Sequence, residues 1–126
     1  MGMGRTVLVA EDDLDLLDMV TSILERAGLR VVRAKNGAEL VQHLAEDDGI
    51  DLVLTDVTMP WMSGAQAALS ARNAGLKMPV ILMTALRGRA LAQALVPLGT
   101  NTLVLCKPFG VAELVSTVKS VLKLEA

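Results

Sequence analysis

Five short runs of apolar and β-branched residues, each followed by a segment of helical periodicity, constrain the fold of this chain most strongly. The runs are TVLVA (6–10), LRVVRA (29–34), DLVLTD (51–56), PVILMT (79–84) and NTLVLC (101–106). Apolar strands that alternate with helices are typical of a parallel sheet covered on both faces. The pattern therefore predicts one α/β domain with a doubly wound, five-stranded parallel sheet and five helices.

The segments between and after these runs have the spacing of amphipathic helices. We expect helices over 13–27, 36–47, 64–74, 89–98 and 111–124. Gly28 follows the first of them, at the position where glycine commonly ends a helix. The chain has no internal repeat, low-complexity tract or linker, so we expect a single domain over 1–126 with a core of about 5–124.

Composition excludes several classes of protein. Of the 126 residues, 52% are hydrophobic and 21% charged, which is the balance of a globular domain rather than a disordered chain. A formal charge of −2 offers no basic surface for nucleic acid or for an anionic membrane. No apolar run is long enough to span a membrane, the start is no signal peptide, and a lone Cys106 suits a reducing compartment. We expect a cytoplasmic protein with no direct nucleic-acid or membrane binding.

Polar residues follow four of the five expected strands. The first strand is followed by Glu11 and Asp12, the third ends in Asp56, the fourth ends in Thr84, and the fifth is followed by Lys107. Taken singly, each has an ordinary explanation as a helix cap, a solvated lysine or a β-branched strand residue. The carboxyl ends of parallel strands, however, meet at the edge of the sheet where ligands bind. Their joint occurrence there favours a functional site.

The chemistry of this set points to phosphoryl transfer. Three carboxylates in one cleft repel each other unless a cation lies among them, and a ligand set made only of oxygen suits Mg²⁺. A metal ion, an ammonium and a hydroxyl can together neutralise a transferring phosphoryl group. The sequence has no Gly-rich phosphate-binding loop, so a bound nucleotide is not expected. The nucleophile is then a side chain, and Asp56 is the candidate because a carboxylate can form an aspartyl-phosphate.

At these residues the chain resembles the receiver domain of two-component response regulators, of the kind found in chemotaxis regulators. The matching pieces are VLVAEDD, TDVTMPWMSG, PVILMTA and CKPF, which occur in the order of the family and with nearly its spacing. The resemblance covers about 5–124. It implies a flavodoxin-like sheet with the strand order 2-1-3-4-5.

The resemblance assigns the acidic residues. It implies that Asp56 is the phosphoacceptor, that Asp12 ligates Mg²⁺ directly, and that Glu11 ligates it through water. The backbone carbonyl of Thr58 completes the protein's share of the metal ligands. Asp13 then falls at the start of the first helix, where a cap is the expected role.

The resemblance also assigns the residues around the phosphoryl group. Thr84 is expected to hydrogen-bond one phosphoryl oxygen and Lys107 to pair with another, with a cis peptide before Pro108 that aims Lys107 into the site. The position of Leu86 is one of those that tune the lifetime of the phosphoryl group in the family. Val104 stands where receivers usually carry Tyr or Phe, so we expect the change of state to pass through the loop 84–86 and the fourth helix.

These observations support three functions. The first is a switch that takes a phosphoryl group from a sensor histidine kinase or phosphotransfer protein, catalyses its own phosphorylation and dephosphorylation, and contacts a downstream protein or output domain. The second is a pseudo-receiver that binds partners without phosphate, which the missing aromatic residue suggests. The third is a phosphatase, which would need an aspartate at the position of Thr58.

The segment ALAQALVPLG (90–99) leaves two interpretations open. Gln93 is its one polar side chain, whereas a helix on a surface usually has a polar face. Either this is a short helix buried on two sides, or it belongs to a docking surface made of the fourth helix, the fifth strand and the fifth helix.

Overall fold

The computed structural model of the chain describes residues 4–47, 49–57, 66, 77–96 and 101–123. Five parallel strands form one sheet in the order β2-β1-β3-β4-β5, as predicted. The strands are β1 (Thr6–Ala10), β2 (Arg30–Ala34), β3 (Leu52–Asp56), β4 (Val80–Thr84) and β5 (Thr102–Cys106). The doubly wound α/β fold is therefore confirmed.

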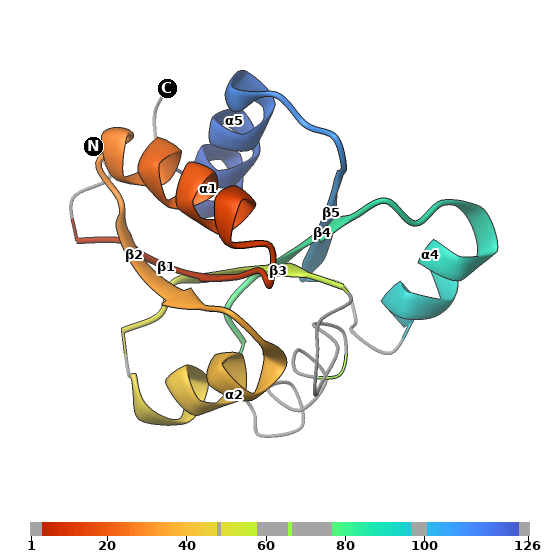
Figure 1. The fold of residues 1–126 in the computed structure, drawn as a ribbon, viewed down its shortest axis with the longest axis horizontal. Helices are drawn as coiled ribbons and strands as arrows, with labels where there is room; N and C mark the ends of the chain where they lie inside the picture. The colour runs from red at the N-terminus through yellow and green to blue at the C-terminus, as the bar shows by residue number, and fades with distance from the viewer. Residues whose placement is uncertain (1–3, 48, 58–65, 67–76, 97–100, 124–126) are drawn as a thin grey trace.

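Four of the five expected helices lie in the described residues. They are α1 (Leu14–Arg26), α2 (Gly37–Glu46), α4 (Gly88–Leu95) and α5 (Val111–Leu122). Helices α1 and α5 lie side by side on one face of the sheet, and α2 covers the opposite face (Figure 1). The helix predicted over 64–74 falls outside the described residues. No helix of the described part has the length and apolar content to cross a membrane.

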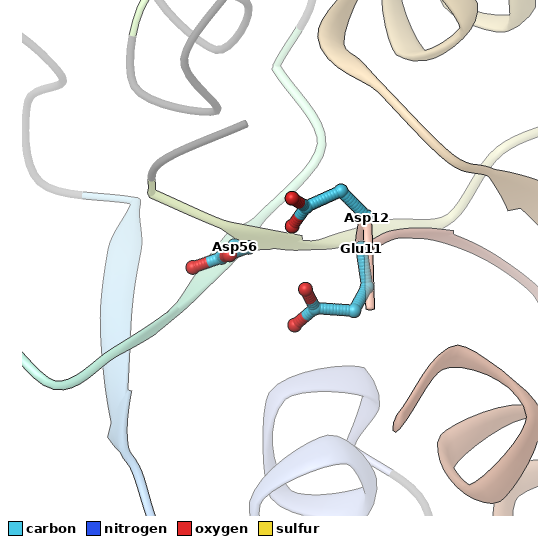
Figure 2. A group of neighbouring side chains, drawn as sticks. All are labelled: Glu11, Asp12 and Asp56. Atoms are coloured by element: carbon cyan, nitrogen blue, oxygen red, sulfur yellow. The ribbon is translucent and has the colours of Figure 1, made fainter. Parts of the chain in front are cut away.

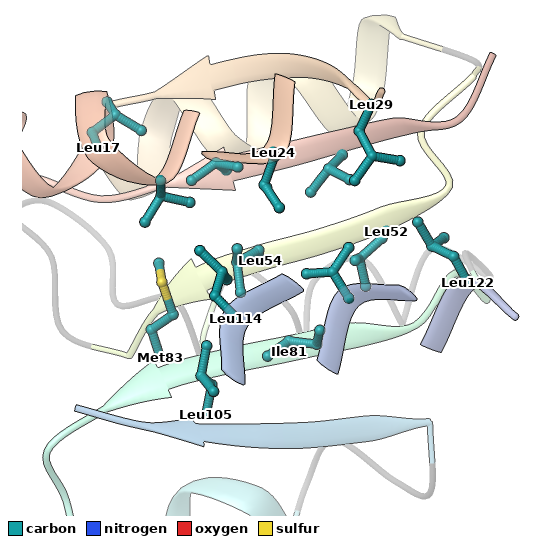
Figure 3. Close-up of a cluster of buried hydrophobic side chains, with 14 residues drawn as sticks. Leu17, Leu24, Leu29, Leu52, Leu54, Ile81, Met83, Leu105, Leu114 and Leu122 are labelled. Carbon is teal, nitrogen blue, oxygen red and sulfur yellow. The ribbon is translucent and has the colours of Figure 1, made fainter. Parts of the chain in front are cut away.

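The core consists of two apolar clusters, one on each face of the sheet. Alternate strand residues such as Val9, Leu54 and Met83 pack under α1 and α5 (Figure 3), and their neighbours Leu8, Val53 and Leu82 pack on the opposite face. This alternation follows from the two-residue period of a strand. Full burial of each such side chain contributes about 1.5–3 kcal/mol. The two clusters thus hold the strand ends rigidly at one edge.

The start of α1 confirms the role predicted for Asp13. The Oδ1 atom of Asp13 accepts hydrogen bonds from the backbone N–H groups of Asp15, at 3.1 Å, and Leu16, at 3.2 Å. A capping aspartate satisfies N–H groups that have no partner inside the helix. The cap lies three residues after the end of β1 and fixes where α1 begins.

Helix α4 is the least buried helix of the described structure. None of its residues is fully buried, although Ala94 and Leu95 pack partly against the cluster that contains Leu82. For residues 90–96, which the structure describes, the interpretation as a helix buried on two sides is therefore wrong. Beside it, Val96 and Leu103 are exposed apolar side chains, 81% and 50% accessible.

Candidate functional site

The acidic residues predicted to meet at one edge of the sheet do so. Strands β1 and β3 are neighbours with Ala10 opposite Thr55, which places Glu11 and Asp12 beside Asp56. One carboxylate oxygen from each of these three residues, which we call the acidic group, lies within 4.8 Å of the other two. Figure 2 shows the three side chains converging from the ends of the two strands. The convergence follows from the parallel sheet, because both strands end at the same edge.

Glu11 is the most buried member of the group. Its side chain is 1% exposed, and its oxygens accept hydrogen bonds from Lys107 Nζ at 2.9 Å and from the backbone N–H of Asp13 at 3.2 Å. Burial, together with the nearby charge of Asp56, raises the pKa of the Glu11 carboxyl in spite of these two hydrogen bonds. Glu11 is therefore a carboxylate whose charged form depends on a neighbouring cation.

Lys107 provides that cation. Besides its contact with Glu11, its Nζ atom lies 3.5 Å from Oδ1 of Asp56, and its side chain is a quarter exposed. Burial alone would lower the pKa of the Lys107 ammonium, but the hydrogen bond to Glu11 and the charges of Asp56 and Glu11 outweigh burial and raise it. Lys107 is thus held as an ammonium between two carboxylates.

The backbone ties Lys107 to the end of β4. The N–H of Lys107 donates a hydrogen bond of 2.8 Å to the carbonyl oxygen of Thr84. The peptide bond between Lys107 and Pro108 is cis, as the resemblance implied. The end of β4 and the loop after β5 therefore lie together at the site.

Thr84 lies at the site, but its hydroxyl has a partner in its own loop. The side chain is buried, and Oγ1 accepts a hydrogen bond of 2.9 Å from the backbone N–H of Leu86. Leu86 itself is half-buried and packs against the cluster that contains Leu82. Val104 is half-buried opposite Leu82 on β5. Thr58 lies outside the described residues.

The sequence did not indicate one contact next to the site. The guanidinium of Arg87 donates from Nη1 to the carbonyl oxygen of Leu86, at 3.0 Å, and from Nη2 to that of Lys107, at 3.2 Å. In the sequence, Arg87 lies shortly before the apolar segment 90–99 and matches none of the motifs described above. A link between residues twenty positions apart leaves no trace in helical or strand periodicity.

The site adjoins an apolar hollow of about 420 Å³. Its lining residues come from α1 and from the loops after β4 and β5, and they are Leu16, Met19, Ala85, Lys107, Pro108 and Phe109. Among the lining residues that belong to the described part of the chain, Lys107 is the one that carries a charge. The ammonium therefore stands between the acidic group and an apolar surface.

The acidic group fits a hard divalent cation. Its donors are oxygen atoms only, they are close enough to share one ion, and Glu11 is a buried carboxylate. Asp12 is exposed and Asp56 half-buried, so the remaining ligand positions of such an ion can be filled by water. These features match Mg²⁺, which keeps several waters when it binds to carboxylates.

Comparison with known proteins agrees with this geometry. The chain is 35% identical over 121 residues to a CpxR homolog, a transcriptional regulatory protein of Haemophilus influenzae, covering 95% of this chain and 51% of that protein. It is 32% identical to the response regulator receiver protein CpdR of Brucella abortus, covering 94% of this chain and 97% of that protein. The chain thus spans about half the length of the CpxR homolog but nearly all of CpdR.

Solved structures show the same fold. The receiver domain of a Francisella response regulator, 1452, superposes with a TM-score of 0.85 at 26% identity, over 94% of this chain and 97% of that one. A response regulator receiver protein of Sinorhizobium medicae gives 0.83 at 30% identity, over 95% of both chains. The family model for the response regulator receiver domain matches residues 7–119. The chain belongs to the receiver-domain family of response regulators.

Proposed function

We propose that this receiver domain is a phosphorylatable switch whose Asp56 accepts a phosphoryl group from the phosphohistidine of a sensor histidine kinase or a phosphotransfer protein. One observation carries the proposal: three carboxylates and the Lys107 ammonium converge at the edge of the sheet. A set of helix caps would not bring a buried Glu11 and a partly buried lysine to within 2.9 Å of each other. The arrangement is the one that phosphoryl chemistry requires.

Asp12 and Asp56, with the backbone carbonyl of Thr58, would hold Mg²⁺ directly, and Glu11 would hold it through water. When bound, Mg²⁺ neutralises negative charge on the phosphoryl oxygens. The protein residues then position the group. Glu11 orients the Lys107 ammonium through its 2.9 Å hydrogen bond.

In the transfer step, an oxygen of the Asp56 carboxylate attacks phosphorus. The new O–P bond forms as the P–N bond breaks, and the electron pair of that bond stays on the imidazole nitrogen of the donor. The Lys107 ammonium is 3.5 Å from the carboxylate and offsets the negative charge that gathers there. The Thr84 hydroxyl can donate to a phosphoryl oxygen, because among the described residues it accepts a hydrogen bond from Leu86 N–H and donates none.

The phosphoryl group would be removed by hydrolysis. Water attacks phosphorus, the O–P bond to Asp56 breaks, and inorganic phosphate leaves while the Asp56 carboxylate is restored. Leu86 lies two residues past Thr84, where its half-buried side chain limits access. We propose that it lengthens the life of the aspartyl-phosphate. This domain would thus catalyse both its own phosphorylation and its own dephosphorylation.

The domain would pass its signal to a partner through the face made of α4, β5 and α5. Support comes from the apolar side chains exposed there, Val96, Leu103 and Val111. A downstream protein or an output domain would bind this face. We propose that the domain acts in the cytoplasm and contacts neither nucleic acid nor membrane directly.

The test is intact-mass spectrometry after incubation with acetyl phosphate and Mg²⁺. One phosphoryl adduct should form, and it should be absent from Asp56→Asn and from protein treated with a chelator. Asp15→Asn is the matched control, because Asp15 is an exposed carboxylate in the first turn of α1. It should be phosphorylated like the native protein.

The second candidate is the pseudo-receiver, which binds partners without phosphate. The half-buried Val104 favours it, because no aromatic side chain at this position can change its place with the phosphoryl state. A folded protein that gains no adduct within seconds to hours would support this candidate and refute the switch.

A further inference from the structure

We propose that Arg87 is a positioning residue that joins the loop carrying Thr84 to the loop carrying Lys107, so that the two act on the phosphoryl group as one unit. The proposal rests on the proposed function of this site. It concerns a side chain that contacts neither the acidic group nor the metal position, and that acts through the backbone of its neighbours.

The geometry of the contact suggests this role. One guanidinium donates to the carbonyl oxygen of Leu86 at 3.0 Å and to that of Lys107 at 3.2 Å. We call this pair of hydrogen bonds the Arg87 bridge. Its two acceptors belong to the loop after β4 and to the loop after β5, which are the segments that present Thr84 and Lys107.

The Arg87 bridge closes a ring of hydrogen bonds beside the site. The Lys107 N–H donates to the Thr84 carbonyl at 2.8 Å, and the Thr84 hydroxyl accepts from Leu86 N–H at 2.9 Å. Arg87 then returns from Leu86 to Lys107. A shift of Thr84 toward a phosphoryl oxygen would therefore disturb the same ring of hydrogen bonds that positions the backbone of Lys107.

The backbone changes conformation between Arg87 and Gly88. Arg87 is extended, with φ of −137° and ψ of 163°, and it immediately precedes α4. Gly88 follows with φ of 59°, a conformation that glycine adopts without strain. The Arg87 side chain therefore extends from the residue directly before the first residue of α4.

Arginine is the residue that can make this bridge. Its planar guanidinium presents several N–H donors in a fixed fork, whereas lysine is a single flexible point charge. The alternative role of Arg87 is that of a solvated cation, which would only attract anionic phosphoryl donors such as acetyl phosphate. Lysine would serve that purpose equally well, so the two roles predict different effects of Arg87→Lys.

The test compares Arg87→Gln, Arg87→Lys and the matched control Arg89→Gln, an exposed arginine two residues further along α4. The rate of Asp56 phosphorylation by acetyl phosphate and Mg²⁺ is followed by quenched intact-mass spectrometry. Both Arg87 variants should be slower by about tenfold, which corresponds to the loss of hydrogen bonds from a charged donor. Arg89→Gln should keep the native rate and the native urea midpoint.

A double-mutant cycle separates positioning from a general effect. If Arg87 acts through Lys107, then Arg87→Gln should cause no further slowing in protein that already carries Lys107→Met. Three results would overturn the proposal: a native rate in Arg87→Gln, a native rate in Arg87→Lys, or equal slowing by Arg87→Gln with and without Lys107.

Hydrogen exchange of the unphosphorylated protein tests the bridge independently of phosphate. The backbone N–H groups of Leu86 and Lys107 should exchange about fivefold faster in Arg87→Gln than in the native protein or in Arg89→Gln. If the native protein takes up no phosphoryl group, the proposed function fails, and this measurement still decides on the bridge. Unchanged exchange at both groups would refute it.

Discussion

Replacing Lys107 with Met should destabilise the metal-free protein in a way that depends on pH. The substitution keeps most of the side-chain length and removes the ammonium that lies 2.9 Å from Glu11 and 3.5 Å from Asp56. Glu11, which is 1% exposed, would then be a buried carboxylate with no ammonium beside it. A chelator keeps divalent ions from taking the place of the ammonium.

The magnitude follows from two opposing effects. At an effective dielectric constant of ~20, each contact is worth about 5 kcal/mol of attraction, but the cost of removing the charges from water cancels much of it. Breaking a buried ion pair costs about 3–5 kcal/mol in other proteins. Because Lys107 is a quarter exposed, water replaces part of its contribution. We expect a loss of about 2–3 kcal/mol in the free energy of unfolding at pH 8.

The sign of the pH dependence follows from Glu11. Its pKa is already raised by burial, and Lys107 lowers it through a hydrogen bond and through charge. Removing Lys107 therefore raises the pKa of Glu11 further. The ordinary pKa of a glutamate carboxyl is about 4.5, and Glu11 has a higher pKa in the folded protein. The free energy of unfolding therefore falls as pH rises above this ordinary value. The destabilisation should be smaller at pH 5 than at pH 8, because the fraction of Glu11 that is charged increases with pH.

Urea denaturation at pH 5, 6.5 and 8 measures this, with Lys77→Met as the control. Lys77 is exposed and lies away from the acidic group, so its variant should match the native protein at every pH. An equal loss of stability at pH 5 and pH 8 would refute the reasoning, because it would mean that packing and not the Glu11 charge causes the loss. Mg²⁺ should restore more stability to Lys107→Met than to the native protein.

Three further substitutions test separate parts of the description. Asp12→Asn removes an exposed carboxylate of the acidic group, so the affinity for Mg²⁺, measured by titration calorimetry, should fall about tenfold, while unchanged affinity would mean that Asp12 is no ligand. Asp13→Ala removes the cap of α1 and should lower the free energy of unfolding, measured by urea denaturation, by about 1 kcal/mol. An unchanged free energy would mean that water replaces the cap. Leu114→Ala opens a cavity under α5, where Leu114 is fully buried, and should lower the free energy of unfolding by about 2–5 kcal/mol. A loss below about 1 kcal/mol would show that neighbouring side chains move in to fill the cavity.

The strands and the meeting of the acids could be predicted from the sequence because both depend on local pattern and general topology. Apolar runs bounded by polar residues locate the strands, and β3 and β4 begin within one residue of the expected positions. The parallel arrangement then brings the residues after β1 and β3 to the same edge. The cap at Asp13 was equally local, since it depends on the first turn of α1 alone.

Other features depend on tertiary distances that no short pattern encodes. The sequence placed Lys107 at the site but did not predict its hydrogen bond with Glu11. That bond depends on how far each of the two side chains extends across the end of the sheet. The exposure of α4 could not be read from its apolar composition, because burial depends on what packs against a helix. The Arg87 bridge joins the loop after β4 to the loop after β5, and no short pattern encodes a contact between them.

The contact between Lys107 and Glu11 joins residues 96 positions apart, and this separation has a consequence for the synthesis of the protein. A ribosome adds about 5–20 residues per second and releases the N-terminal end first. Glu11, Asp12 and Asp56 therefore emerge before Lys107, which follows the edge strand β5. Until β5 joins the sheet, the nascent chain carries its clustered acids without their ammonium. The carboxylates at the ends of β1 and β3 thus gain the Lys107 ammonium late in folding, when the last strand, β5, joins the sheet.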